Sequence, residues 1–347
     1  MKGAFMRTTS TIVPVKFVLL LVTAVAGCGK SEPPTVVVYT ALDQEFSKPI
    51  FEAFTKEKGI VVKVKYDAES TKTVGLTKVI LDERERPRCD LFWNNEVLNT
   101  LRLERAGLLR PYHSKAAEAY PAQDRSPKDL WFGFAARARV LIVNTNQVPE
   151  ERRPKSIRDL ADPQWYERCA IAKPLFGTTA TQAACLFAAW GDDKAKDFFR
   201  DVKHNARIES GNKQVAEAVA AGTLAFGLTD TDDAIVEIEK AMPVAIIYPD
   251  QAADQPGTLY IPNTLALIKG SPHPAEAERL VEYLLSGDVE RRLADGPSAQ
   301  IPLRPGVPAS PRVKTPPEIR AMEVDWSAAA DKWDTAAEFL KAEFTAP

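Results

Sequence analysis

The sequence predicts an α/β protein with two lobes, discontinuous in the chain, and a cleft between them. Three observations lead to this fold class. Short apolar runs alternate with helical stretches over residues 35–106, and the same alternation returns from residue 139 onward. Two extended segments, residues 131–136 and 257–267, are suited to cross from one lobe to the other. At 347 residues, the chain also has the length of about two domains.

The first 27 residues are predicted to be an export signal that does not belong to the fold. They contain three cations and no acid, and they end in an apolar run over residues 17–27. That run is shorter than the roughly 20 residues that span a bilayer, but it suits a signal peptide. Small residues directly before Cys28 resemble the bacterial lipobox. We therefore expect an exported chain, anchored through a lipidated Cys28 and a tether over residues 28–34, with a plain secretory leader as the alternative.

The composition is that of an ordinary soluble protein. Apolar residues make up 45% and charged residues 27% of the chain. The net charge of −2 argues against a nucleic-acid partner, which usually meets a strongly basic surface. Besides Cys28, an odd number of cysteines remains (Cys89, Cys169 and Cys185), and none has the spacing of a zinc site. The sequence therefore predicts no cofactor.

The first part of the mature chain is predicted to form a βαβαβα series. Residues 35–40 (TVVVYT) are almost all apolar and mostly β-branched, which is typical of a strand covered on both faces. The predicted elements are a strand at 35–40, a helix at 46–58 ended by Gly59, a strand at 60–66, a helix at 70–84, a strand at 89–93 and a helix at 97–106. This order implies a mostly parallel sheet.

The second half of the chain repeats this pattern. Gly191 and Gly222 follow two of its helical stretches, where glycine commonly ends a helix. The predicted strands are 139–144, 169–172 and 224–228, and the predicted helices are 178–190, 212–221 and 276–285. A Pro-rich stretch, residues 301–317, precedes a last helix or two.

Polar side chains gather where predicted strands give way to helices. In open α/β sheets, ligands bind at the carboxyl ends of strands, near helix N-termini. The helix that begins near Thr178 suits an anion, because its free backbone donors and its dipole both face the ligand. The candidate ligand-binding residues are Thr40, Ala41, Ser70, Asn94, Asn95, Glu96, Thr178, Thr179, Asn212, Asp230, Thr231 and Asp232.

These candidates also have structural alternatives. Thr178 can simply cap its helix, and Asp230 and Asp232 can be first-turn acids that a helix dipole favours. For Arg137 and Arg139, near one proposed crossover, a contact to an anion and a structural ion pair are both open.

Several stretches, taken together, resemble one family. They are VVVYTALDQEF, TKTVGL, DLFWNNE, GLLRPY, FAARARVLIVNT, PLFGTTATQAACLFAAWG, GLTDTDDA, YPDQ and IPNTLALIKGSPHP. In this order, over about residues 35–303, they are similar to the family 1 extracellular solute-binding proteins, in particular to the branch labelled ferric-iron ABC transporter substrate-binding. The resemblance implies a type II periplasmic-binding-protein fold, in which two α/β lobes joined by hinge strands close on a ligand in the interlobe cleft.

The predicted crossovers and the resemblance together divide the chain. Lobe 1 is expected to hold residues 35–130 and 262–303, and lobe 2 is expected to hold residues 131–261. Residues 304–347 are expected to form a C-terminal tail that packs on lobe 2.

The resemblance also implies a function. The protein would be a monomer on the periplasmic or cell-surface side that captures a small solute and delivers it to the permease of an ABC importer. Ferric-binding members typically carry two adjacent tyrosines in the region where this chain has residues 229–232. Without phenolates, iron would depend on Glu96, Asp230 and Asp232.

We therefore expect a small polar or phosphorylated organic anion as the ligand, with ferric iron as the ligand that the branch implies. An exported acid–base enzyme that uses Glu96, Asp230 and Asp232 is the rival from another class. The chain has no nucleophile motif such as GxSxG and no metal motif such as HExxH, which argues against this rival.

Overall fold

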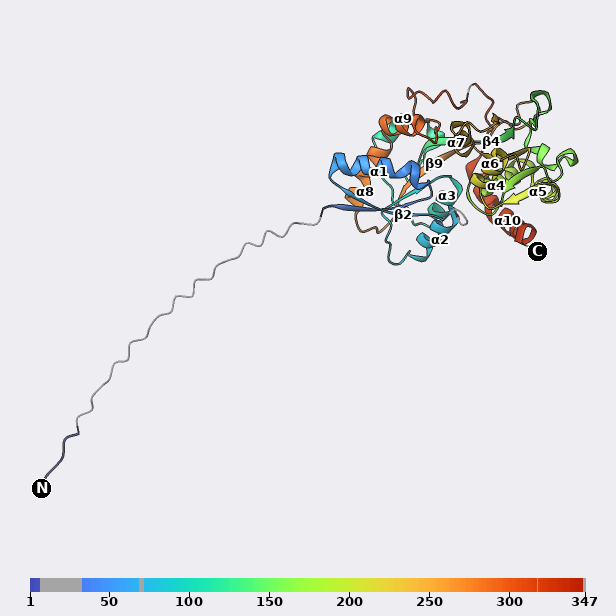
Figure 1. Cartoon of the computed structure of the whole chain (residues 1–347). Coiled ribbons are helices and arrows are strands. Elements are labelled where there is room, and N and C mark those ends of the chain that lie inside the picture. The colour runs from blue at the N-terminus through green and yellow to red at the C-terminus, as the bar shows by residue number, and fades with distance from the viewer. Residues whose placement is uncertain (7–32, 69–71, 317, 346–347) are drawn as a thin grey trace. The chain divides into compact units, whose positions relative to one another are not determined.

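The structure is a computed structural model that describes residues 1–6, 33–68, 72–316 and 318–345 (Figure 1). Residues 33–347 form a unit of their own, which holds the strands and helices. The apolar run of the predicted leader, the lipidation site Cys28 and the candidate Ser70 lie outside the described residues, so these predictions remain predictions.

The strands form a mixed sheet. In the described residues they are β1 (Thr35–Thr40), β2 (Val61–Tyr66), β3 (Leu91–Asn94), β4 (Phe132–Asn144), β5 (Cys169–Ala172), β6 (Arg207–Glu209), β7 (Phe226–Asp230), β8 (Val244–Ile247) and β9 (Tyr260–Leu267). Hydrogen bonds join them in the order β2-β1-β3-β9-β4-β7-β5-β6, with β8 beside β4. β1 pairs in parallel with β2 and β3, and β5 does so with β6 and β7. The parallel pairing predicted for the strands of the first part of the chain is confirmed for β1, β2 and β3. β4 and β9 run antiparallel to their neighbours, so the sheet as a whole is mixed.

Helices follow most of the strands. The α-helices are α1 (Gln44–Lys58), α2 (Val74–Asp82), α3 (Leu98–Arg105), α4 (Gly177–Trp190), α5 (Asp192–Asn205), α6 (Asn212–Ala220), α7 (Thr231–Glu239), α8 (Pro274–Leu284), α9 (Gly287–Asp295) and α10 (Trp326–Thr345). Short 3₁₀ helices are η2 (Ala116–Ala119), η3 (Ala122–Asp124), η4 (Glu150–Arg152), η5 (Ile157–Ala161) and η6 (Pro163–Trp165). Within the described ranges, none of the helices combines the length and the apolar character of a membrane span.

Local sequence explains several of these bounds. β1 has the bounds that the sequence predicts, and its Val36 and Val38 are fully buried. α1 ends at Gly59, whose φ of +67° lies in the left-handed region that glycine adopts at little cost. α5 is absent from the predicted elements, although its buried Ala195, Phe199 and Val202 recur at helical spacing.

β4 and β9 lie at the centre of the strand order and contain most of the two segments predicted to cross between lobes. Residues 132–138 of β4 pair with β9, whereas residues 139–144 pair with β7 and β8. β4 therefore joins β9, β3, β1 and β2 on one side to β7, β5, β6 and β8 on the other. Its side chains lie where these two groups of strands meet. The division of the chain into two lobes at residues 130, 261 and 303 remains a prediction.

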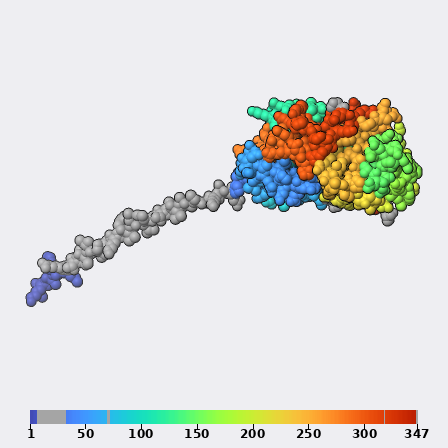
Figure 2. Space-filling model, turned by 45° about the horizontal axis from the view of Figure 1, so that its top comes forward, coloured from blue at the N-terminus to red at the C-terminus, as the bar shows by residue number. Residues whose placement is uncertain are grey.

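The C-terminal tail returns to the middle of the chain. α10 packs against α4 and α5, and also against α3. Trp333, Ala336 and Leu340 on α10 are buried in the same apolar cluster as residues of α4 and α5. The tail, coloured orange to red, is seen on the face that Figure 2 shows. It therefore touches helices on both sides of the predicted boundary at residue 130.

Candidate functional site

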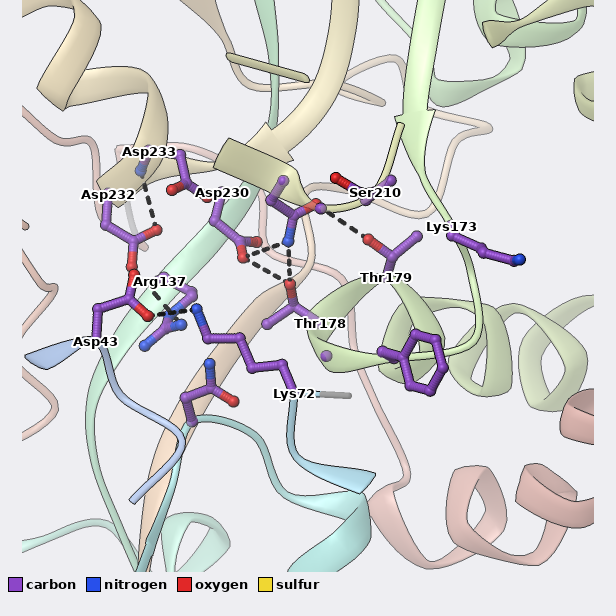
Figure 3. Close-up of a pocket in the computed structure, with 16 residues that line it drawn as sticks. Asp43, Lys72, Arg137, Lys173, Thr178, Thr179, Ser210, Asp230, Asp232 and Asp233 are labelled. Atoms are coloured by element: carbon purple, nitrogen blue, oxygen red, sulfur yellow. Dashed lines mark hydrogen bonds and ion pairs between the residues drawn. The ribbon is translucent and has the colours of Figure 1, made fainter. Parts of the chain in front are cut away.

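A polar pocket lies at the carboxyl ends of β5, β6 and β7, where α4, α6 and α7 begin (Figure 3). Ligands commonly bind at such strand ends in α/β sheets. The free volume of the pocket in this structure is about 30 Å³, room for about two water molecules. The residues that line it are Asp43, Lys72, Asn95, Arg137, Ala172, Lys173, Phe176, Gly177, Thr178, Thr179, Ser210, Gly211, Asn212, Asp230, Asp232 and Asp233.

Arg139 does not itself line this pocket, but its side chain binds four side chains that do. It extends from β4, and its side chain is fully buried. Its guanidinium donates to Gln182 Oε1 (2.9 Å), Thr178 Oγ1 (3.2 Å), Asn212 Oδ1 (3.1 Å), Asp230 Oδ1 (2.8 Å) and Thr179 Oγ1 (3.2 Å). Of the two roles that the sequence leaves open for Arg139, the geometry supports a structural ion pair, made with Asp230.

The polar side chains around Arg139 also bind one another. Thr178 Oγ1 donates to Asp230 Oδ2 at 2.5 Å, and Asn212 Nδ2 donates to the same oxygen at 3.0 Å. Thr179 Oγ1 donates to Asn212 Oδ1 at 3.1 Å. Six predicted ligand-binding residues line the pocket: Asn95, Thr178, Thr179, Asn212, Asp230 and Asp232. The four that surround Arg139 already have partners for their side chains. What α4 and α6 offer a ligand is mainly backbone N–H groups of their first turns, because these have no partner within a helix; the N–H of Gly177 is the exception, since it donates to the carbonyl of Lys72.

Three carboxylates gather at the start of α7. Asp230, Asp232 and Asp233 each place an oxygen within 4.8 Å of the others. Burial raises the pKa of Asp232, and the nearby Asp230 raises it further, although Arg137 opposes the shift. Burial and the carboxylates of Asp232 and Asp230 raise the pKa of Asp233 well above its ordinary value. Among the described residues, Asp230 and Asp232 each have an ion pair with an arginine, whereas Asp233 has none.

Protein cations face the other carboxylates. Arg137 Nη1 lies 3.6 Å from Asp232 Oδ2, and Lys72 Nζ lies 2.5 Å from Asp43 Oδ1. In Figure 3 the side chain of Lys72 extends across the pocket to reach Asp43. The pocket therefore holds both signs of charge.

Two buried polar atoms in the pocket wall have no hydrogen-bond partner within the described part of the chain. They are Nε of Arg137, a donor, and Oδ1 of Asn95, an acceptor. Arg137 is 3% exposed and Asn95 is 2% exposed, so bulk water does not readily satisfy either atom. Buried polar atoms without partners are uncommon, and a missing ligand or water is a usual cause. The geometry of Arg137 supports the anion contact that the sequence leaves open for it.

Glu96 does not take part in the pocket. Its fully buried carboxylate accepts from the backbone N–H groups of Leu98 and Asn99, from Asn94 Nδ2 (2.6 Å) and from Thr181 Oγ1 (3.0 Å). Burial raises its pKa, and these hydrogen bonds oppose the shift. The expected convergence of Glu96 with Asp230 and Asp232 is therefore wrong, because Glu96 is used at the start of α3 and Asp233 takes its place.

Four further candidates are buried outside the pocket lining. Thr40 Oγ1 accepts from the backbone of Leu42, and the backbone N–H of Ala41 donates to Trp93. Asn94 holds Glu96 and the backbone of Asn95, and Thr231 Oγ1 accepts from the backbone of Ala138. None of these four residues lines the pocket, and each of these groups already has a partner within the protein, so their role as ligand contacts remains a prediction.

The pocket also contains polar residues that are absent from the predicted set. These are Asp43, Lys72, Lys173, Ser210 and Asp233. All but one lie within two residues in sequence of a predicted site residue, and Lys173 directly follows a predicted strand. A rule that includes the two residues on either side of each candidate and the residue directly after each predicted strand would have found them.

A family model, relatives of known name and solved structures are all similar to this chain. A family model described as bacterial extracellular solute-binding protein matches residues 90–332. Iron uptake protein A1 of Synechocystis sp. is 26% identical over 305 residues, which cover 84% of this chain and 81% of that protein. Iron-bound HitA from Pseudomonas aeruginosa has a TM-score of 0.81 and 26% identity, covering 89% of this chain and 99% of that one. The periplasmic binding protein AfuA from Actinobacillus pleuropneumoniae, solved with exogenous fructose 6-phosphate, has a TM-score of 0.81 at 19% identity and covers 90% and 99%.

Proposed function

The chain belongs to the bacterial extracellular solute-binding protein family, and from this premise we propose that its polar pocket binds a small organic anion that also carries an amino or hydroxyl group. The predicted α/β periplasmic-binding-protein fold is confirmed by the likeness to solved members. Proteins of this family are substrate-binding components of ABC importers and not enzymes, so the acid–base enzyme is excluded as a rival.

The balance of charge in the pocket carries this proposal. Asp230 is paired with Arg139, Asp232 faces Arg137, and Asp43 faces Lys72. A bare trivalent cation would have to bind carboxylates that protein cations already neutralise, and each of those cations would repel it. A solute with both an anionic and a donor group meets both signs of charge at once.

The unpartnered atoms of the wall support the same class of solute. Nε of Arg137 needs an acceptor, and a carboxylate, phosphate or phosphonate supplies one with charge assistance. Oδ1 of Asn95 needs a donor, and the carboxylate of Asp233 favours a cationic one. An amino or hydroxyl group meets both needs. Because the free volume is only about 30 Å³, the surrounding walls must move apart to admit such a solute.

Ferric iron is the second candidate. The oxygens of Asp230, Asp232 and Asp233 lie within 4.8 Å of one another, and hard cations prefer carboxylate oxygen. The names of two similar proteins, iron uptake protein A1 and iron-bound HitA, also favour it. Against it, no tyrosine or histidine occurs among the described residues that line the pocket.

A thermal-shift and calorimetric comparison of small solutes tests the proposal. We expect 2-aminoethylphosphonate, which carries an ammonium group and an anion, to raise the melting temperature by several degrees at 100 times its Kd, equivalent to about 2.7 kcal/mol. Ethylphosphonate and ethanolamine, which each lack one group, are expected to bind at least about tenfold more weakly. Fructose 6-phosphate tests a hydroxyl-bearing anion. Tight, stoichiometric binding of ferric citrate, with no response to any of the organic solutes, would instead support the second candidate.

We also propose that the chain is a monomer, delivers its solute to a membrane permease and is anchored through lipidated Cys28. The support is the basic, apolar leader pattern and the small residues before the cysteine. Cys28→Ala is expected to shift the protein from the membrane fraction to the soluble fraction or to leave it unprocessed. Cys89→Ala is the matched control, since that cysteine is buried and free. A cleaved Cys28→Ala protein that stays with the membrane would contradict the anchor.

A further inference from the structure

A second cavity, apolar and larger than the polar pocket, lies between α10, the start of α4 and the start of α2. Its volume is about 380 Å³, within the range of about 300–1,000 Å³ typical of small-molecule sites. The described residues that line it are Val74, Pro174, Leu175, Phe176, Ala180, Trp333, Ala336, Ala337, Leu340, Lys341 and Thr345. All of these except Lys341 and Thr345 are apolar.

The walls of this cavity are formed by buried side chains of α10 and α4. Trp333, Ala336 and Leu340 recur at helical spacing along one face of α10, and each is at most 6% exposed. Ala180 of α4 faces them from the opposite wall and is 7% exposed. Small side chains at positions 180, 336 and 337 leave the space open, while the Trp333 ring offers an aromatic surface. An aromatic or aliphatic body therefore fits the interior.

The chemistry changes at the C-terminal end of α10. Lys341 and Thr345 are exposed, and Lys341 is the one charged side chain among the described residues of the lining. Within the described part of the chain, the Lys341 ammonium group makes no ion pair or hydrogen bond. An ammonium group beside an apolar cavity favours an anionic group on the occupant.

We infer that this cavity is a second ligand site, which binds an amphipathic organic anion with its ring or alkyl body between α4 and α10 and its anionic group beside Lys341. The site is separate from the polar pocket. Among the described residues that line the two cavities, only Phe176 belongs to both linings. The inference therefore does not depend on the solute that the polar pocket binds.

Two fluorescent dyes test the inference on the purified protein. 1-Anilinonaphthalene-8-sulfonate carries the anionic group, and N-phenyl-1-naphthylamine has the same apolar body without it. Both are expected to bind, with one dye per chain. Lys341→Gln is expected to weaken the sulfonate dye by roughly 3–10-fold and to leave the affinity of the neutral dye unchanged. Equal effects on both dyes would overturn the placement of the anionic group.

A filling substitution tests the position of the cavity. Ala337→Trp places a large ring in it and is expected to weaken both dyes at least tenfold. Ala342→Trp is the matched control, because Ala342 is exposed on the same helix and does not line the cavity. If Ala337→Trp lowers the melting temperature, Ala337→Leu repeats the test with a smaller side chain. Dye binding that survives every filling substitution, that is lost equally in the control, or that is missing from the unmodified protein would refute the site.

Discussion

Replacing Arg139 with methionine is expected to lower the free energy of unfolding by about 3–5 kcal/mol, as measured by urea denaturation. The guanidinium is fully buried and binds five side chains, among them the carboxylate of Asp230. Methionine fills a similar volume but leaves Asp230 buried without a cation. That uncompensated charge, more than the lost hydrogen bonds, sets the size of the effect.

The control for this prediction is Arg200→Met. Arg200 lies on α5, is about half exposed, and pairs with Asp197 and Glu343 at the surface. Such pairs contribute about 0–1 kcal/mol, so this variant should remain close to the unmodified protein. The double variant Arg139→Met/Asp230→Leu removes both buried charges and should be more stable than Arg139→Met alone. A loss below about 1 kcal/mol in Arg139→Met would mean that Asp230 does not depend on Arg139.

Sequence reasoning located the pocket because the signal for it is local. The polar residues after β5 and β7 follow short apolar runs, and that pattern marks the carboxyl end of a strand. Thr178 and Asp230 follow from this pattern, whereas Asn212 follows from its place at the start of a predicted helix; all three line the pocket. The same local signal cannot tell which polar atoms remain available to a ligand.

The pairings that the sequence did not predict are contacts between residues that are far apart in the chain. Glu96 meets Thr181 across 85 positions and Arg139 meets Asp230 across 91, so no window of sequence shows that these groups are already paired. The mixed sheet has the same cause. β9 pairs with β3 and β4, far from it in the chain, and its apolar pattern does not reveal its direction. Periodicity was enough to predict the type of most elements, with α5 as an exception, whereas the pairing of strands and the partners of buried polar groups were not predictable from it.

Replacing Arg137 with glutamine is expected to weaken binding of an organic anion but not binding of ferric iron. For an organic anion, the variant loses a charge-assisted hydrogen bond in a buried wall, which should weaken binding by roughly 10–100-fold. For ferric iron, the variant removes a positive charge 3.6 Å from Asp232 and should strengthen binding or leave it unchanged. Isothermal titration with 2-aminoethylphosphonate and with ferric citrate measures both affinities.

Two further variants separate this effect from a general loss of structure. Arg137→Lys keeps the charge and should recover part of the affinity for the anion, but without the planar geometry of the guanidinium. Arg158→Gln removes a guanidinium from η5, outside the pocket lining, and should leave both affinities unchanged.

The pH dependence of binding tests whether the carboxylates of Asp232 and Asp233 contact the solute. Because burial raises the pKa of Asp232 and Asp233, these groups take up protons at a higher pH than an ordinary aspartate, so affinity for an ammonium-bearing solute should fall as the pH is lowered through that raised range. Loss of ferric binding in Arg137→Gln, with binding of the organic solute intact, would reverse the preference argued here.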